Sequence, residues 1–362
     1  MNRLFINAAS LVLLGSLPDV VAMGQTADSA LHLAVFVQGP VTVKRPGWSG
    51  YAPVTFGTYL KLGDLLRLDE SSQAKVVCSD LTLHDVTSGV AGVPCLASQP
   101  LLRRPNGSLI NPTRGWEGYG SLPLVLSPRK TKVISLHPLL QWTPVEGASS
   151  YRIIVRGPNL VWSANVGAVT KFVYPESAPE LKPGTDYKLI VEAGGQSSAA
   201  EPGLGLGFSL LPSDEEKAVA EEERKIEDLG LPAGPTQFLI AHLYAAHGLN
   251  ADAIQRLEEI SPTFHAPAVA RLLGDLYLSV GLTRRAEASY MNSLNLSKND
   301  DDDEGRMSAH MSLARIYEEA LGNTKEAIQH VDACLALANK IGDKETARQA
   351  EKKLAELTKQ GL

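Results

Sequence analysis

The segment from Arg271 to Tyr290, RLLGDLYLSVGLTRRAEASY, contains residue types that catalytic sites use. It holds a carboxylate at Asp275, a phenol at Tyr277 and a basic pair at Arg284 and Arg285. These groups could act as acid, base and anion binder if the fold pointed them into one cleft. Alternatively, they are polar positions of a helical scaffold. The residues around them decide between the two interpretations.

A repeat of small, aromatic and glycine residues runs through the C-terminal third of the chain. Gly248 and Gly281 lie 33 residues apart. Three units carry a small residue, a Tyr, a Gly, an Ala and a large apolar residue in the same order. The units are Ala241, Tyr244, Gly248, Ala253 and Leu257; Gly274, Tyr277, Gly281, Ala286 and Tyr290; and Ala314, Tyr317, Gly322, Ala327 and Val331. The third unit has one extra residue before its Gly.

This order resembles that of the tetratricopeptide repeat, a pair of helices with a period of about 34 residues. The clearest copy is Leu273-Gly274-x-x-Tyr277 with Ala286-x-x-x-Tyr290. The resemblance implies an all-α solenoid over residues 234–362, because one helix pair cannot bury its apolar face alone. The amphipathic segment Asp343–Lys359 would be its capping helix. We therefore interpret Tyr277 as a core residue, and Arg284 and Arg285 as solvent-facing.

The resemblance also implies a groove, because the first helices of tetratricopeptide pairs line a concave surface that holds peptides. The positions that map to it are Phe238, His242, Arg271, Asp275, Met311 and Arg315. They lack the Lys and Asn set with which such domains clamp a terminal carboxylate. The alternative for each is an ordinary exposed helix face. We expect a protein or peptide partner and no nucleic acid, since the net charge of −6 provides no basic surface.

Residues 31–115 alternate apolar and polar positions in short runs, a pattern typical of β-strands. Three groups of residues stand out: Gly39-x-Val41-x-Val43 with Arg45; Gly57-x-x-Leu60-x-x-Gly63-Asp64-x-Leu66; and Ser72-x-Ala74-x-Val76. They resemble the FecR-like domain family, and the Gly63-Asp64 turn is the most specific part. The resemblance implies an all-β unit outside a bacterial membrane that senses or binds other envelope components.

A second β region spans residues 131–212, with period-two runs in SYRIIVRG and DYKLIVEAG. Together with HPLLQWTPVEG and LKPGTDY, these runs resemble a fibronectin type III-like sandwich. The resemblance implies that Trp142 is buried and that the hydroxyl of Tyr187 bonds back to the backbone. We expect residues 116–130 to be a linker and residues 213–230 to be a connecting helix. A capping box of Ser213 and Glu216 would open that helix.

The N-terminus predicts export. Residues 1–22 combine a basic start, an apolar run and small residues at its end, the order found in a cleaved signal peptide. The mature chain is then expected in the periplasm, at the cell surface or secreted, and not embedded in a membrane. In an oxidising compartment Cys78 and Cys95 could form a disulfide. The alternative is two free, buried thiols.

Other candidate chemistry is not supported by its spacing. Asn299–Gly305, NDDDDEG, lacks the alternating acids of a calcium loop and predicts an exposed loop between helices. His330 and Cys334 are four residues apart without a further ligand pair, which favours core packing over metal binding. GLGLG at residues 203–207 is not a phosphate loop, and HExxH, GxSxG and P-loop motifs do not occur. We expect no metal and no cofactor.

These patterns predict a multidomain chain with an N-terminal all-β FecR-like domain, a central fibronectin type III-like β-sandwich and a C-terminal all-α tetratricopeptide-repeat solenoid. We interpret it as a non-enzymatic exported adaptor or scaffold of the bacterial cell envelope that binds a protein in its groove. An alternative is an envelope-sensing or cell-wall-binding protein whose FecR-like domain carries recognition. A hydrolase site in the linker region is a third interpretation, since catalytic triads assemble from residues far apart in the sequence and need no local motif.

Overall fold

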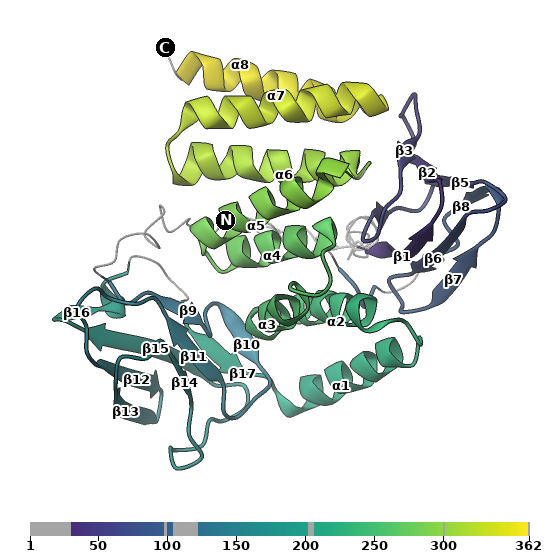
Figure 1. Cartoon of the computed structure of the whole chain (residues 1–362). Coiled ribbons are helices and arrows are strands. Elements are labelled where there is room, and N and C mark those ends of the chain that lie inside the picture. Colours follow the sequence, from purple (N-terminus) through teal and green to yellow (C-terminus); the bar gives the residue numbers. More distant parts are fainter. Residues whose placement is uncertain (1–29, 98–99, 104–121, 202–205, 300, 361–362) are drawn as a thin grey trace, which may run out of the picture.

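The computed structural model describes residues 30–97, 100–103, 122–201, 206–299 and 301–360. Figure 1 shows helices stacked in one array, with two β-sheet units packed against different parts of it. The predicted signal peptide, part of the predicted linker and most of the GLGLG segment lie outside the described residues. Among the helices of these ranges, none is long and apolar enough to cross a membrane.

The N-terminal β unit consists of two antiparallel sheets that share a core. Across each sheet the strands follow the orders β4-β1-β6-β7 and β3-β2-β5-β8. Their bounds are β1 (His32–Gln38), β2 (Val41–Lys44), β3 (Ala52–Pro53), β4 (Tyr59–Leu60), β5 (Leu65–Leu68), β6 (Gln73–Val77), β7 (Leu83–Val86) and β8 (Gly89–Gly92). Alternate residues such as Val41, Val43 and Leu66 are buried between the sheets. The period-two pattern thus predicted the strands of this region correctly.

A disulfide and a tight turn hold the N-terminal unit together. Cys78 and Cys95 are joined, with their sulfurs 1.94 Å apart. Gly63 has a φ of +95°, a conformation that favours glycine, and leads into the fully buried Asp64. The carboxylate of Asp64 accepts a hydrogen bond from the backbone of Lys61 at 2.9 Å. The Gly63-Asp64 pair therefore makes the turn that its residue types indicate.

The second β unit is a sandwich of two sheets. One sheet has the order β14-β11-β9, and the other has the order β10-β17-β15-β12-β13 with β16 beside β15. Their bounds are β9 (Val125–Ser127), β10 (Thr131–Val133), β11 (Leu139–Trp142), β12 (Tyr151–Gly157), β13 (Leu160–Val166), β14 (Lys171–Val173), β15 (Asp186–Ala193), β16 (Gln196–Ser197) and β17 (Phe208–Leu210). Trp142 is buried in the shared core. The hydroxyl of Tyr187 accepts a hydrogen bond from the backbone of Lys182 at 2.7 Å, the contact expected for this tyrosine.

The rest of the described chain is helical and forms a TPR-like array. The α-helices are α1 (Ser213–Glu227), α2 (Ala233–Ala246), α3 (Asn250–Ile260), α4 (Pro267–Ser279), α5 (Thr283–Leu296), α6 (Asp303–Arg315), α7 (Thr324–Ile341) and α8 (Lys344–Gln360). Gly248, Gly281 and Gly322 have φ values of +77°, +80° and +64°. Each lies in the turn between the two helices of a pair, where the left-handed conformation favours glycine. The repeat of paired helices is confirmed.

The extra residue of the third unit has a structural counterpart. A π-helical turn, Ile316–Ala320, continues α6 before the turn at Gly322. A π-helical turn accommodates an additional residue without ending the helix, because its hydrogen bonds span five residues instead of four. The third pair therefore keeps the packing of the other two despite its insertion.

Small residues allow the paired helices to approach closely. A Cβ placed on Gly274 would lie 2.7 Å from the ring of Tyr290, closer than carbon atoms pack. Tyr277 is 6% exposed, so the residue singled out by its chemistry is part of the core. Ala286 is fully buried in the same cluster. These positions carry the internal contacts that the repeat predicts.

Two local predictions are wrong. Asp302 and Asp303 are buried, although the acidic segment predicts an exposed loop. Asp302 is the N-cap of α6 and accepts a hydrogen bond from the backbone of Gly305 at 3.0 Å, and Asp303 is the first residue of the helix. Basic residues pair with both carboxylates. Helix α1 does begin at Ser213, but its N-terminal end has no side-chain cap. The capping box predicted for Ser213 is therefore absent.

A buried arginine of the sandwich links it to the helices. Arg129 donates to both carboxylate oxygens of Glu201, at 2.8 and 2.6 Å. The same guanidinium donates from Nε to the carbonyl of Val280, at the end of α4, at 2.7 Å. Beside it, Thr131 accepts a hydrogen bond from the backbone of Ala251 at 3.0 Å. The position of the sandwich thus depends on specific polar contacts to α3 and α4.

Candidate functional site

The surface formed by α2, α4, α6 and α8 contains the six residues predicted to line a groove, and we call it the groove face. The structure divides them into two sets. Phe238 and His242 are fully buried, and Arg271 is 7% exposed, because the N-terminal β unit lies over them. Asp275, Met311 and Arg315 line an adjacent cleft that nothing in the described chain fills. The groove face therefore has a covered part and an open part.

The covered part receives a loop of the N-terminal β unit. The ring of Phe56 lies 5.0 Å, between centroids, from the ring of Phe238. Phe56 also meets Phe264 edge to face, at 4.9 Å. Gly57 comes so close to α4 that a Cβ there would overlap the side chain of Ala268. The loop is thus seated among the helices as an extended peptide would be.

The side chain of His242 lies beneath this loop. Its ring contacts Phe238 edge to face at 4.7 Å and Tyr59 at 6.0 Å between centroids. Since Tyr59 belongs to the β unit, the same imidazole packs against both parts of the chain. A ring enclosed in this way contributes packing to the interface, and a partner can reach it only after the β unit has moved.

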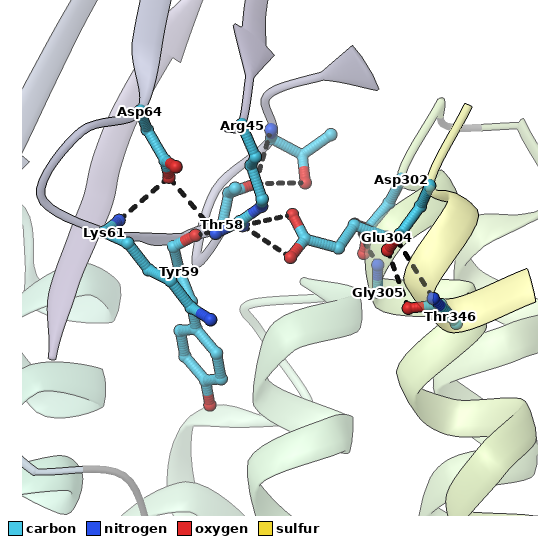
Figure 2. A network of polar contacts seen from close by, with 11 residues as sticks. Arg45, Thr58, Tyr59, Lys61, Asp64, Asp302, Glu304, Gly305 and Thr346 are labelled. Carbon is cyan, nitrogen blue, oxygen red and sulfur yellow. Dashed lines mark hydrogen bonds and ion pairs between the residues drawn. The ribbon is translucent and has the colours of Figure 1, made fainter. Parts of the chain in front are cut away.

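Arg45 connects the turn at Gly63-Asp64 to the helical array, as Figure 2 shows. Its Nη1 donates to the carboxylate of Asp64 at 3.1 Å, and its Nη2 donates to the carbonyl of Tyr59 at 2.6 Å. Nη2 also reaches Glu304 of α6, with the second carboxylate oxygen at 2.6 Å. Arg45 is 8% exposed, so these charges interact with little screening by water.

Arg271 has an internal partner in the helical array. Its Nη1 donates to Asp302 at 2.7 Å, and both side chains are buried. A side chain at Gly305 would overlap both of these groups, so glycine is required where α6 crosses the pair. Arg271 therefore holds the start of α6 in place. Because Arg271 is buried and paired, it does not present its charge on the open part of the groove face.

The open cleft has a volume of about 380 Å³. Its lining residues are Asp275, Ser308, Met311, Ser312, Ala314, Arg315, Glu318, Glu319 and Lys353. Lys353 of α8 pairs with Glu318 at 2.7 Å, which closes one side. The apolar side chains of Met311 and Ala314 line the cleft together with charged groups, a composition suited to a peptide with both kinds of side chain.

The groups that suggested catalysis are used in separate internal contacts. Tyr290 donates to Asp275 at 2.6 Å, and burial with this carboxylate raises the pKa of Tyr290 well above its ordinary value. Tyr277 donates to Glu258, to which Arg285 also donates at 3.4 Å. Burial, and then Glu258, raise the pKa of Tyr277 as well. Both phenols thus stay protonated at neutral pH and serve as structural donors.

One cluster of metal-ligand types occurs in the described residues, and it involves His32, Cys78 and Cys95. The disulfide leaves neither cysteine with a thiolate for a metal. His32 Nδ1 accepts a hydrogen bond from the backbone of Ser79 at 3.1 Å. Burial lowers the pKa of His32, so the ring is neutral and packs beside the disulfide.

The functionally placed residues that the sequence interpretation missed are Phe56, Tyr59 and Glu304. Phe56 and Tyr59 flank Gly57 of the FecR-like pattern, but no local signal says that they face helices far along the chain. Glu304 lies in the acidic segment that predicts a loop. Arg45 belongs to the FecR-like pattern, and its partner Asp64 belongs to the Gly63-Asp64 turn, the most specific part of that pattern.

Comparisons with known proteins give distant likenesses to helical repeats. No protein-family model matches the chain, and no curated protein matches it. A crystal structure of MamA is 14% identical, over 41% of this chain and 93% of that one, with a TM-score of 0.29. Kinesin light chain TPR-like repeats from Podosopora anserina are 19% identical, over 40% of this chain and 79% of that one, with a TM-score of 0.32. The TPR-like assignment of the helices rests on their own repeat and pairing.

Proposed function

We propose that this chain is a non-enzymatic adaptor that binds a protein partner through the open cleft of its groove face. The observation that carries the proposal is that Asp275, Met311 and Arg315, predicted as groove residues, meet in one open cleft of about 380 Å³. Paired-helix arrays create extended concave surfaces that bind partners. The internal use of Tyr277 and Tyr290 supports the same view, since their chemistry is committed to the core.

We further propose that the chain acts in the envelope of a bacterium. The predicted signal peptide, the FecR-like pattern of the N-terminal unit and the disulfide between Cys78 and Cys95 support an oxidising, exported location. In this proposal the N-terminal unit and the fibronectin type III-like sandwich position the helical array. The N-terminal unit also occupies part of the groove face, so the partner is restricted to the open cleft.

The proposal is tested by blocking the cleft while leaving the covered part intact. Ser308→Trp with Glu319→Lys places bulk and reversed charge at two exposed positions of the cleft wall. Mature wild-type protein, this variant and a Lys325→Glu control on an exposed site of α7 would be used to capture proteins from an envelope extract. We expect one specific partner with the wild type and the control, and loss of that partner with the cleft variant. Equal recovery by all three would remove the cleft from the account.

A second candidate function places recognition on the N-terminal β unit. Its strand β8 lies at the edge of a sheet, and Val90 on that strand is 60% exposed. Leu65 on the neighbouring strand is 42% exposed. An unpaired edge with exposed apolar residues can accept another strand or a surface. Loss of partner capture in a Val90→Lys variant, with capture unchanged in the cleft variant, would favour this function.

A further inference from the structure

A second cavity lies where the sandwich meets α3, α4 and α5, away from the groove face. We call it the interdomain hollow, and its volume is about 290 Å³. Leu139 and Gln141 of β11 form one wall, while Asp252 and Gln255 of α3 and Val280 after α4 form the other. A space of this size, between two units and lined by apolar and polar groups, has the features of a small-ligand site.

Most charges in the wall of the hollow are matched within the chain. Arg129 is paired with Glu201, with both side chains almost fully buried. Arg285 is paired with Glu258, which also accepts from Tyr277. After these pairs are formed, Asp252 remains as a carboxylate without an ion pair among the described residues of the wall. Arg256 also acts on Asp252, but its guanidinium is paired with Glu223. Asp252 is therefore a carboxylate of this wall that has no ion pair among the described residues.

Asp252 is held so that one of its oxygens lacks a partner. A hydrogen bond with the backbone of Ile134 acts on the carboxylate, yet Oδ2 is buried and has no hydrogen-bond partner within the part of the chain described. A buried, unpartnered carboxylate oxygen is unfavourable unless a donor or a cation reaches it. The hollow beside Asp252 is the space from which such a group can come.

A second hollow of about 340 Å³ lies on the other side of Asp252. The two hollows share Ser135, Asp252 and Gln255 in their walls. The two hollows therefore adjoin at these side chains, and Asp252 borders both. Within the interdomain hollow, the apolar side chains of Leu139 and Val280 can pack against a hydrocarbon chain. The amide oxygens of Gln141 and Gln255 can accept hydrogen bonds from N–H donors.

We propose that the interdomain hollow binds an organic monocation with an apolar chain, of the kind presented by a lysine side chain, with its ammonium group at Asp252. The ammonium supplies three donors, and the carboxylate, Gln141 and Gln255 supply acceptors for them. Leu139 and Val280 cover the alkyl chain. This site is independent of the open cleft and of the adaptor function.

The ionisation of Asp252 gives the site a pH dependence. Burial raises the pKa of Asp252 to about 6, so the carboxylate is ionised at pH 7.5 and becomes protonated below pH 6. Binding of a cation should therefore weaken as the pH falls through 6. The other charged or titratable groups that line the two hollows are Arg129, His137, Tyr244, Arg256, Glu258, Glu259, Tyr277 and Arg285.

The experiment is a calorimetric titration of the full mature chain with Nα-acetyl-lysine amide, and with Nα-acetyl-norleucine amide as a ligand of similar shape without the ammonium. We expect saturable binding of the lysine compound at pH 7.5, at least tenfold weaker binding at pH 5, and none of the norleucine compound. Asp252→Asn should weaken binding at least tenfold, because it keeps the shape and removes the charge. Glu227→Gln, which removes an exposed carboxylate of α1 that lines neither hollow, should change affinity less than twofold.

A third variant separates loss of charge from loss of space. Leu139→Trp fills the hollow without changing any charge, and it should abolish binding while circular dichroism shows an intact fold. Absence of binding by the wild type, equal binding of both compounds, or an unchanged affinity in Asp252→Asn would each overturn the proposal. Equal weakening by Asp252→Asn and Glu227→Gln would also overturn it, because diffuse attraction by the acidic surface would then be sufficient.

Discussion

Phe56 of the N-terminal β unit and Phe238 of α2 pack with their ring centroids 5.0 Å apart, although 182 positions separate them in the sequence. The contact joins the loop between β3 and β4 to the first helix pair of the array. It places a side chain of the protein itself on the surface where a helical-repeat domain would hold a peptide. The N-terminal unit therefore acts as a resident occupant of the groove face.

The first prediction concerns Gly57, which combines a φ of +77° with close approach to Ala268 of α4. Gly57→Ala should destabilise the interface between the β unit and the helices by about 2–4 kcal/mol, from the left-handed backbone and from overpacking. Gly47→Ala is the matched control, because Gly47 has a φ of +85° and nothing near its Cβ position. Urea unfolding of both variants measures the difference, and equal losses would contradict the seating of the loop on α4.

The second prediction concerns the contact of Arg45 with Glu304. Arg45→Leu leaves Asp64 buried without its ion pair and should cost about 3–5 kcal/mol of folding stability. Glu304→Gln should cost about 1 kcal/mol or less, since Glu304 is partly exposed and Arg45 keeps Asp64. A double-mutant cycle on urea unfolding gives the coupling between the two residues. Independent, additive losses would show that the pair does not link the two units.

The third prediction concerns the buried pair of Arg129 and Glu201. Glu201→Gln removes the charge that matches Arg129, whose side chain is 1% exposed, and should destabilise the protein by about 3–5 kcal/mol. The control is Glu192→Gln, which removes the partner of Arg152 in an exposed pair and should cost less than about 1 kcal/mol. Hydrogen exchange should show faster exchange in α3 and the end of α4 for Glu201→Gln only. Similar protection in both variants would argue against a structural role of the pair.

The fourth prediction concerns pH and the contact between His310 and His330, whose Nδ1 atoms lie 2.9 Å apart. Burial, and then His330, lower the pKa of His310 to about 4, and burial lowers that of His330. The folded state thus binds fewer protons than the unfolded state below pH 6.5. The contribution of the two neutral rings to the free energy of unfolding is fully present above pH 6.5 and is lost as the pH falls towards 4. We expect a loss of about 1–2 kcal/mol, because water partly screens the rings.

His310→Gln should flatten this dependence, because an amide can keep a hydrogen bond to His330 without titrating. The measurement is the urea midpoint of wild type and variant at pH 7.5, 5.5 and 4.5. The charged groups that act on the two rings are Arg306, Glu287 and Glu326, and they are present in both proteins. Asp252, whose raised pKa changes stability with pH in the opposite direction, is also present in both proteins. Its contribution therefore cancels when the wild type and the variant are compared. Parallel curves for wild type and variant would contradict the prediction.

The helical array could be predicted in detail because its determinants are local. The glycines that end first helices need a left-handed backbone, and Gly274 needs to be small because Tyr290 packs against it. The extra residue before Gly322 appears in the structure as a π-helical turn. Each of these effects acts within one helix pair, so a repeating sequence records it directly.

The docking of the N-terminal unit could not be predicted in this way. Strand alternation shows which face of the strands with Val41 and Leu66 is buried. It does not show that Phe56 and Gly57 contact α2 and α4. Arg45 and Glu304 attract each other only after chain segments far apart have been brought together. The acidic run predicts an exposed loop because charged side chains favour solvent. In the structure Arg271 pairs with Asp302 and Lys340 pairs with Asp303.

Photo-crosslinking tests the division of the groove face most directly. A small diazirine-bearing residue would be introduced in place of Phe56, and separately in place of Ser308, in cells that produce the full chain. We predict that position 56 crosslinks within the chain to α2 near Phe238, and that position 308 crosslinks to a separate protein. Crosslinks from position 56 to other proteins, with α2 left unmodified, would show that the N-terminal unit does not occupy the groove face and would contradict the account.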